Sequence, residues 1–179
     1  VSTIRATAST AALAVSVAIC VGARATADDL NVWAVDPHVK VFRDTGPQIA
    51  VDKVSMRAAR NEYEPAQIAI RAAEDLKGVR VECTALAHAD GQTSIGTERI
   101  TWNFVGFIPL TKNTPHSEHL RLRDAPCEVP DPLVDVKSVD VPANSSQPVW
   151  ITVHVPKDAV PGLYRGEIVV ATDNGRATV

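Results

Sequence analysis

The clearest alternation of hydrophobic and polar positions lies near the end of the chain. From residue 149 to 155 every second residue is Val or Ile, and the residues between them are Trp150, Thr152 and His154. This period of two predicts a half-buried β-strand, which ends at Pro156 because proline has no N–H for the ladder. The turn signals Pro161-Gly162 and Asp173-Asn174-Gly175 then predict a strand over residues 163–172 and a hairpin into residues 176–179.

Shorter runs with the same period occur from residue 31 onward, separated by segments rich in Gly, Pro, Asn and Asp. They predict strands over residues 31–35, 39–42, 51–59, 66–71, 79–86, 99–110 and 133–141. We find no internal repeat and no amphipathic helix. Many short strands with regular turn signals favour an all-β fold, an antiparallel β-sandwich with immunoglobulin-like features.

The strand predicted over residues 99–110 is apolar on both faces. Trp102, Phe104 and Ile108 point one way, and Val105 and Phe107 point the other. A strand of this kind lies in the centre of a sheet, or is covered by another layer or domain.

Residues 111–132 have no usable period and contain four prolines. A loop of this length is unusual inside a compact domain, and such loops are often functional or interfacial. His116, Glu118 and His119 carry groups that bind zinc, but the segment lacks the fixed spacing that a helix or knuckle provides. We therefore expect no metal here, and we expect the loop to contact another domain.

The first 27 residues have the features of a secretory signal peptide. Arg5 precedes an apolar run over residues 11–21, and Ala25-Thr26-Ala27 has the form of a cleavage site. The run is too short and too rich in alanine for a transmembrane helix. We expect a secreted or periplasmic protein with no membrane segment after cleavage, in which a β-sandwich domain spans residues 28–179.

Charge argues against nucleic acid as a partner. Loss of Arg5 and Arg24 with the signal peptide lowers the formal net charge from −3 to −5. Binding to phosphates requires clustered Lys and Arg side chains, and no such stripe is present.

Two cysteines, Cys83 and Cys127, follow the signal peptide. Export permits a disulfide between them. Cys83, however, lies in phase with Val79 and Val81, so we favour the interpretation that it is a small core residue.

Glu62 and Glu64 are spaced so that both carboxylates point to the same face of a strand. A pair of carboxyl groups about 5 Å apart is the catalytic arrangement of retaining glycosidases. The favoured interpretation is structural, in which a neighbour such as Arg60 neutralises one carboxylate and water solvates the other. The block around them also fits an edge cap or a contact with a second domain.

Trp150 lies opposite the apolar face of its strand, beside Thr152 and His154. Three interpretations remain open for it: contact with another domain, packing in its own small cluster, or contact with a glycan, since aromatic rings pack on sugar C–H groups. The chain has only three Trp, two Tyr and three Phe, and most of them are needed in the core.

Known nucleotide and hydrolase motifs are missing from the sequence. There is no Gly-x-Ser-x-Gly elbow, no phosphate-binding glycine loop and no dinucleotide fingerprint. We expect no cofactor.

Several blocks of sequence resemble a known family. They are Asn31–Pro37, Ala58–Gln67, Leu76–Val81, Pro130–Leu133, Val141–Asn144 and Gln147–Gly166. In this order they resemble the N-terminal β-sandwich domain of bacterial proteins similar to glycoside hydrolase family 123, over nearly the whole chain after the signal peptide.

The resemblance implies a catalytic (β/α) barrel downstream. In the family, an adjacent Asp-Glu pair of that barrel supports attack by the substrate's own N-acetyl group and releases N-acetylgalactosamine. The barrel is not in this sequence, so no catalytic residue is carried over. The chain also stops four residues after a hairpin turn, inside an expected strand, so we expect it to be truncated.

Our hypothesis is a non-catalytic accessory domain that packs on the barrel of a secreted glycoside hydrolase-like protein. The alternative is a free-standing secreted carbohydrate-binding or adhesion module. The candidate interface or ligand residues are Trp150, His154, Glu62, Glu64, His116 and His119.

Overall fold

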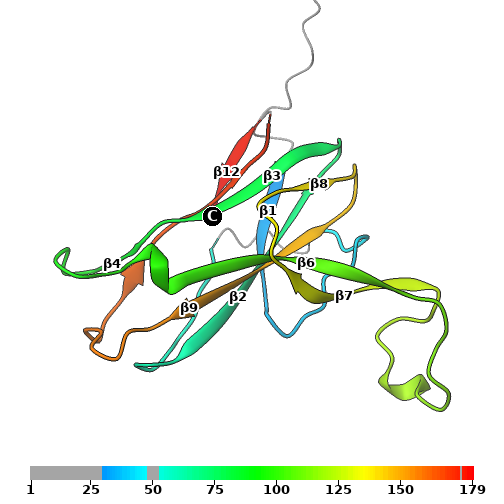
Figure 1. Cartoon of the computed structure of the whole chain (residues 1–179), viewed down its shortest axis with the longest axis horizontal. Coiled ribbons are helices and arrows are strands. Elements are labelled where there is room, and N and C mark those ends of the chain that lie inside the picture. The colour runs from blue at the N-terminus through cyan, green and yellow to red at the C-terminus, as the bar shows by residue number, and fades with distance from the viewer. Residues whose placement is uncertain (1–29, 48–52, 174) are drawn as a thin grey trace, which may run out of the picture.

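The computed structural model describes residues 30–47, 53–173 and 175–179 (Figure 1). In these residues the regular structure consists of β-strands and two short 3₁₀ turns. The signal peptide predicted over residues 1–27 lies outside the described residues. The strands are β1 Leu30–Val35, β2 Tyr63–Ala72, β3 Leu76–Cys83, β4 Leu86–His88, β5 Ser94–Ile95, β6 Ile100–Leu110, β7 Cys127–Val134, β8 Val139–Val141, β9 Gln147–His154, β10 Tyr164–Arg165, β11 Ile168–Ala171 and β12 Arg176–Thr178, and the 3₁₀ turns are η2 Thr97–Arg99 and η3 Glu118–Leu120.

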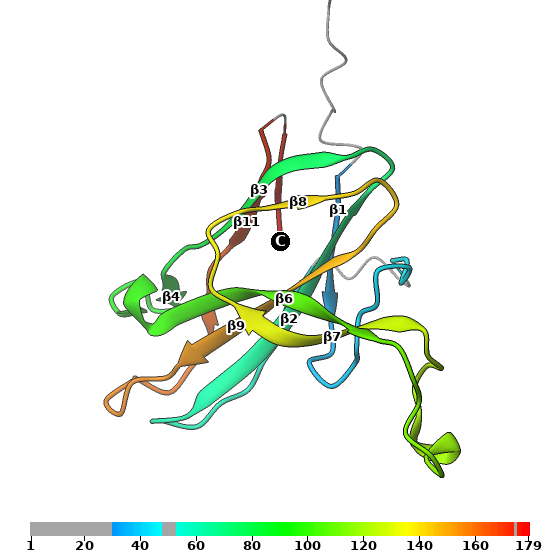
Figure 2. The same cartoon turned by 45° about the vertical axis from the view of Figure 1, so that its right-hand side comes forward.

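The strands form three sheets in which every pair is antiparallel. A five-stranded sheet has the order β1-β2-β9-β6-β7, and a four-stranded sheet has the order β12-β11-β3-β8. A small third sheet has the order β10-β4-β5. Figures 1 and 2 show β3, β8, β11 and β12 on one side of the molecule, across from β2, β9 and β6. This all-β antiparallel arrangement is consistent with a β-sandwich.

The two larger sheets share one hydrophobic core. Ile68 and Ile70 of β2 and Phe104 of β6 are fully buried in it, and they meet Val79 of β3 and Val170 of β11. The alternation predicted for residues 149–155 is confirmed, because Val149, Ile151 and Val153 are buried while Trp150, Thr152 and His154 are half-buried on the opposite face. Burying each such side chain contributes about 1.5–3 kcal/mol.

The expected position of the strand over residues 99–110 is also confirmed. β6 lies between β9 and β7. Phe104 is buried on one face and Val105 on the other. The second half of β6 is less buried than the first, and Ile108 is 48% exposed.

Two predicted strands are wrong, although some of their apolar side chains are packed inward. In residues 39–42, Val41 and Phe42 are buried, but the backbone is a loop. Side chains satisfy that backbone in place of a neighbouring strand: the Gln67 amide donates to the carbonyls of Asp36 and Val39 at 3.1 and 3.0 Å. Thr45 Oγ1 accepts from the Phe42 N–H at 2.9 Å.

The second wrong strand is the one predicted over residues 51–59. Its first two residues lie outside the described part of the chain, and residues 53–59 form no ladder. Val54 and Met56 nevertheless pack against the core. The alternation therefore predicted which side chains face the core. It did not predict whether the backbone has a strand partner.

Several other strand boundaries were also wrong. The predicted loop over residues 111–132 ends early, because β7 begins at Cys127 and contains Pro130 and Pro132. Proline is tolerated there because β7 is the edge of its sheet. The single strands predicted over residues 79–86, 133–141 and 163–172 are each divided, because the chain crosses from one sheet to another.

The predicted hairpin at the end of the chain is confirmed for its described residues. β11 and β12 pair antiparallel, with Ala171 opposite Arg176. The Thr172 N–H donates to the Gly175 carbonyl at 2.8 Å. Asn174 of this turn lies outside the described residues.

Candidate functional site

Tyr63 and His154 form an aromatic pair at one end of the five-stranded sheet. They are direct partners across β2 and β9, and their rings stack with centroids 4.3 Å apart and planes 11° from parallel. Tyr63 is 65% exposed, and β1 does not cover its side of the sheet because β1 pairs with β2 only from Gln67 onward. The fold therefore presents an aromatic side chain to solvent at this position.

A polar hollow of about 250 Å³ opens beside this pair. It is lined by Tyr63, Glu98, Arg99, Thr101, Thr152 and His154. Thr101 and Thr152 are direct partners across β6 and β9. Arg99 Nη1 lies 3.0 Å from His154 Nδ1. We call this feature the Tyr63 hollow.

Glu62 and Glu64 have different surroundings. Glu62 precedes β2, and its Oε2 accepts a hydrogen bond from the Ala59 N–H at 2.5 Å. Glu64 is half-buried within β2 opposite Val153. Arg60, the expected partner, instead donates from Nε to the Ala159 carbonyl at 2.7 Å. Glu62 thus closes the turn before β2, where Asn61 has a positive φ of 61°.

Trp150 is half-buried on the outer face of the five-stranded sheet. It lines a hollow of about 300 Å³ between the loop that follows β1 and strand β7, together with Pro37, Val39, Val105 and Pro130. The loop is held over the sheet by the Gln67 side chain. Trp150 therefore packs among residues of its own domain, and the hollow leaves room beside it.

His116 and His119 lie in an arm, residues 111–126, that projects from the end of β6 and returns into β7 (Figures 1 and 2). Both histidines are exposed, and His116 has a positive φ of 58°. Among the residues that the structure describes, no three His, Cys, Asp or Glu side chains are grouped so that they could hold a metal ion.

The arm has internal polar contacts of its own. Arg121 forms ion pairs with Glu118, at 2.8 Å, and with Asp124. Asn113 donates to Asp124 at 3.0 Å and accepts from the Ala125 N–H at 2.7 Å. These contacts hold Leu120 and Leu122 in the arm while leaving them 75% and 77% exposed.

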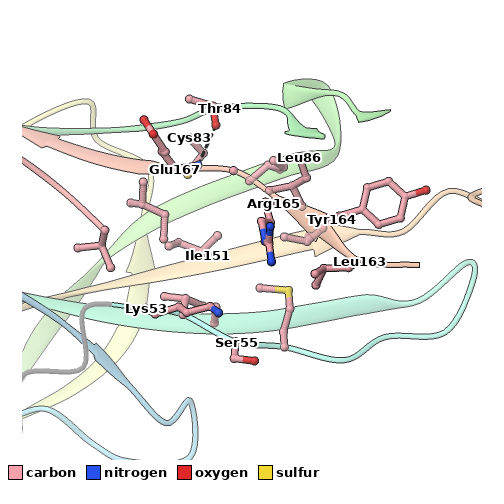
Figure 3. Close-up of a pocket in the computed structure, with 18 residues that line it drawn as sticks. Lys53, Ser55, Cys83, Thr84, Leu86, Ile151, Leu163, Tyr164, Arg165 and Glu167 are labelled. Atoms are coloured by element: carbon pink, nitrogen blue, oxygen red, sulfur yellow. Dashed lines mark hydrogen bonds between the residues drawn. The ribbon is translucent and has the colours of Figure 1, made fainter. Parts of the chain in front are cut away.

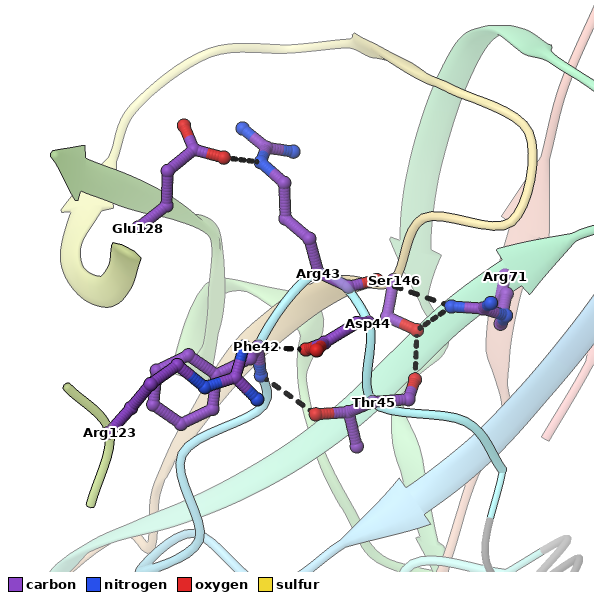
Figure 4. A network of polar contacts seen from close by, with 8 residues as sticks. All are labelled: Phe42, Arg43, Asp44, Thr45, Arg71, Arg123, Glu128 and Ser146. Atoms are coloured by element: carbon purple, nitrogen blue, oxygen red, sulfur yellow. Dashed lines mark hydrogen bonds and ion pairs between the residues drawn. The ribbon is translucent and has the colours of Figure 1, made fainter. Parts of the chain in front are cut away.

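The base of the arm is fastened to the loop after β1 (Figure 4). Arg123 pairs with Asp44 at 2.8 Å and lies over the Phe42 ring at 4.0 Å. Arg43 pairs with Glu128 at 2.6 Å. The hydrogen bond from the Arg123 side chain lowers the pKa of the Asp44 carboxyl. The network is completed by Thr45, Arg71 and Ser146.

An apolar slot of about 300 Å³ lies between the sheets (Figure 3). Met56, Ile151 and Leu163 line it, and Arg165 points into it. Cys83 lies on its wall, and burial raises the pKa of the Cys83 thiol to about 11. Cys83 and Cys127 are both free. Cys83 packs against the core, as the sequence predicted.

Of the residues that line the Tyr63 hollow, sequence reasoning named only His154 as a candidate. It missed Tyr63, Glu98, Arg99, Thr101 and Thr152, and also the two exposed leucines of the arm. Tyr63 is in phase with Gln67 on the outer face of β2, so the alternation of β2 could have placed Tyr63 on that face. Arg99 and Glu98 precede β6 and follow no period, and only the register of β6 with β9 brings them to His154. Leu120 and Leu122 lie in a segment without any period.

No helix among the described residues is long and apolar enough to cross a membrane.

The fold and these surfaces define an all-β antiparallel module. The sequence profile of the glycoside hydrolase 123 N-terminal domain matches residues 35–172. The chain therefore belongs to the family of glycoside hydrolase 123 N-terminal domains.

A solved structure has the same fold. It is a family 123 glycoside hydrolase from Clostridium perfringens, studied for glycolipid glycan hydrolysis, with a TM-score of 0.68 and 14% sequence identity. The match covers 84% of the present chain and 25% of the clostridial one. A search of curated proteins found no match. The matched domain is thus about a quarter of that enzyme's length.

Proposed function

We propose that this chain is the non-catalytic N-terminal accessory domain of a longer, secreted glycoside hydrolase-like protein, and that it packs on and supports a catalytic (β/α) barrel. The observation that carries the proposal is the match to the glycoside hydrolase 123 N-terminal domain over residues 35–172. The coverage of only 25% of the clostridial enzyme supports a parent protein with further domains.

The parent is then a glycosidase that acts on glycans, and the family favours a β-N-acetylgalactosaminidase. Secretion or export to the periplasm follows from the predicted signal peptide, and the immunoglobulin-like character of the sandwich belongs to the same proposal.

The arm is the element best suited to contact the barrel. It projects beyond the sheets (Figures 1 and 2) and exposes Leu120 and Leu122 by about three-quarters. Exposed leucines presented by a fastened loop are typical of an interaction site. The base network around Arg43 and Arg123 holds the arm in one orientation, so docking costs less conformational entropy than the ordering of a free loop.

The first test is to sequence the gene beyond the codon for Val179. Several hundred further residues with βα periodicity and an Asp-Glu pair at a strand end are expected after Val179. A stop codon soon after Val179 would overturn the proposal.

The second test uses the full-length protein with Leu120 and Leu122 both changed to Ser. Because apolar contact with the barrel is lost, the full-length variant should have a lower thermal midpoint. It should also hydrolyse a chromogenic β-N-acetylgalactosaminide more slowly. The same double change in the 179-residue chain should leave stability within about 0.5 kcal/mol, because both side chains are exposed there. The control is Val136 changed to Ser, since this side chain is also exposed but lies outside the arm. Unchanged stability and activity of the full-length Leu120/Leu122 variant would exclude the arm as the docking element.

A further inference from the structure

The Tyr63 hollow is a built polar site that the accessory role does not use. It lies at the start of β6, whereas the arm begins at the end of β6, roughly 30 Å away along the strand. Figure 1 shows the start of β2 and the end of β9 on the opposite side of the molecule from the arm. The hollow is therefore separate from the surface proposed to meet the barrel.

Its side chains combine an aromatic wall with both donors and acceptors. The Tyr63–His154 stack forms the wall. Thr101 and Thr152 add hydroxyl groups, which donate and accept. Glu98 adds an exposed carboxylate and Arg99 a guanidinium, with side chains 73% and 44% exposed.

Arg99 also orients the imidazole of His154. A guanidinium only donates hydrogen bonds, so the contact of 3.0 Å from Arg99 Nη1 requires His154 Nδ1 to accept. In the neutral ring the proton then lies on Nε2, which is a donor. His154 thus carries one ring N–H donor, and its ring stacks on that of Tyr63.

Charge and size restrict what the hollow accepts. Glu98 Oε1 lies 3.9 Å from Arg99 Nε, so the two charges largely offset each other. A volume of about 250 Å³ is below the range of pockets for drug-sized ligands. The site therefore fits one small, neutral, hydroxyl-rich ring.

We infer that the Tyr63 hollow binds a single neutral pyranose unit of a glycan. The C–H groups of the sugar pack on the exposed Tyr63 ring, and its vicinal hydroxyls bond Glu98, Arg99 and the threonines. Because the hollow is shallow and holds one sugar, the dissociation constant is on the order of 1 mM. The inference does not rest on docking to the barrel, because the binding residues all belong to this chain.

The test is a titration of the ¹⁵N-labelled 179-residue chain with methyl β-D-galactopyranoside, methyl β-D-glucopyranoside and, as an acidic probe, methyl β-D-glucuronide. Saturable shifts are expected at the amides of Tyr63, Thr101 and Thr152 with a neutral glycoside. Tyr63→Ala should weaken binding on the order of fivefold or more, and Tyr63→Phe should keep it because the ring remains. Val136→Ala, at an exposed apolar site outside the hollow, is the control.

Three results would overturn the inference: no saturable shift with either neutral glycoside, equal affinity in Tyr63→Ala and the parent chain, or tighter binding of the glucuronide. Tyr63→Phe guards against a folding defect, and the urea unfolding curve of each variant reports its fold. Changing Leu120 and Leu122 to Ser should leave glycoside binding intact, so failure of this inference and failure of arm docking are distinguishable.

Discussion

Gly162 shows how a single residue permits the third sheet to form. A Cβ at this position would lie 2.0 Å from His88 Nε2. The His88 side chain is only 10% exposed, is paired with Asp90 at 2.9 Å and packs on Tyr164 at 4.8 Å between ring centroids. The histidine ring is therefore held between Asp90 and Tyr164.

We predict that Gly162→Ala lowers the free energy of unfolding by about 1–3 kcal/mol, the usual cost of overpacking. Urea unfolding of the 179-residue chain measures it. Gly46→Ala is the control, because a Cβ there meets nothing within 4 Å, and that variant should lose no stability. In a chain that already carries His88→Ala, Gly162→Ala should cost much less stability than it does in the parent chain. Full additivity of the two changes would contradict the steric explanation.

At the scale of elements, the arm is ordered by its own ion pairs more than by packing. Arg121 contacts Glu118 and Asp124, whose side chains are 71% and 75% exposed, so each pair contributes only a few tenths to about 1 kcal/mol. The arm should therefore open locally without unfolding the sheets.

We predict that Arg121→Gln speeds amide exchange at Leu120 and Ala125 by on the order of fivefold to tenfold, while the global unfolding midpoint stays constant. These amides donate to the Ser117 carbonyl and to Asn113 Oδ1. Hydrogen exchange followed by NMR measures both. Lys137→Gln, which removes an ion pair exposed on both sides, should leave the arm unchanged. If the global unfolding midpoint also falls, the arm and the sheets unfold together.

For the molecule as a whole, several aspartate side chains stabilise the folded state when they are charged. The pKa of Asp36, Asp44, Asp90 and Asp140 is lowered from the ordinary value of 3.8. For Asp140 the main cause is the hydrogen bond from the Gly78 N–H, followed by the Lys77 side chain, at 3.0 and 2.9 Å. Asp140 thereby links β8 to β3.

Because these pKa values are lower in the folded state than in the unfolded one, the stabilisation is present above about pH 4 and is lost as the pH falls through the folded values. The free energy of unfolding should be level near neutral pH and decline below about pH 4. Asp140→Asn should make that decline shallower. Urea unfolding at a series of pH values measures both slopes, and a rise in stability on acidification would contradict the assignment.

Part of the architecture was predictable from local pattern alone. The inward positions of β9 and β2, the two buried faces of β6, the last hairpin and the core role of Cys83 all follow from a period of two, because side-chain direction in a strand is a local property. The order of the sequence blocks was sufficient to identify the family.

Only the tertiary structure decided which backbone segments pair and which side chains meet. Residues 39–42 contain buried side chains, and in residues 53–59 Val54 and Met56 are partly buried against the core. Side chains such as Gln67 and Thr45 replace a strand partner in the first segment. Tyr63, Arg99 and His154 meet because β2, β6 and β9 are neighbours in a particular register. Such pairing depends on contacts between residues far apart in the chain, and no periodicity within one segment records them.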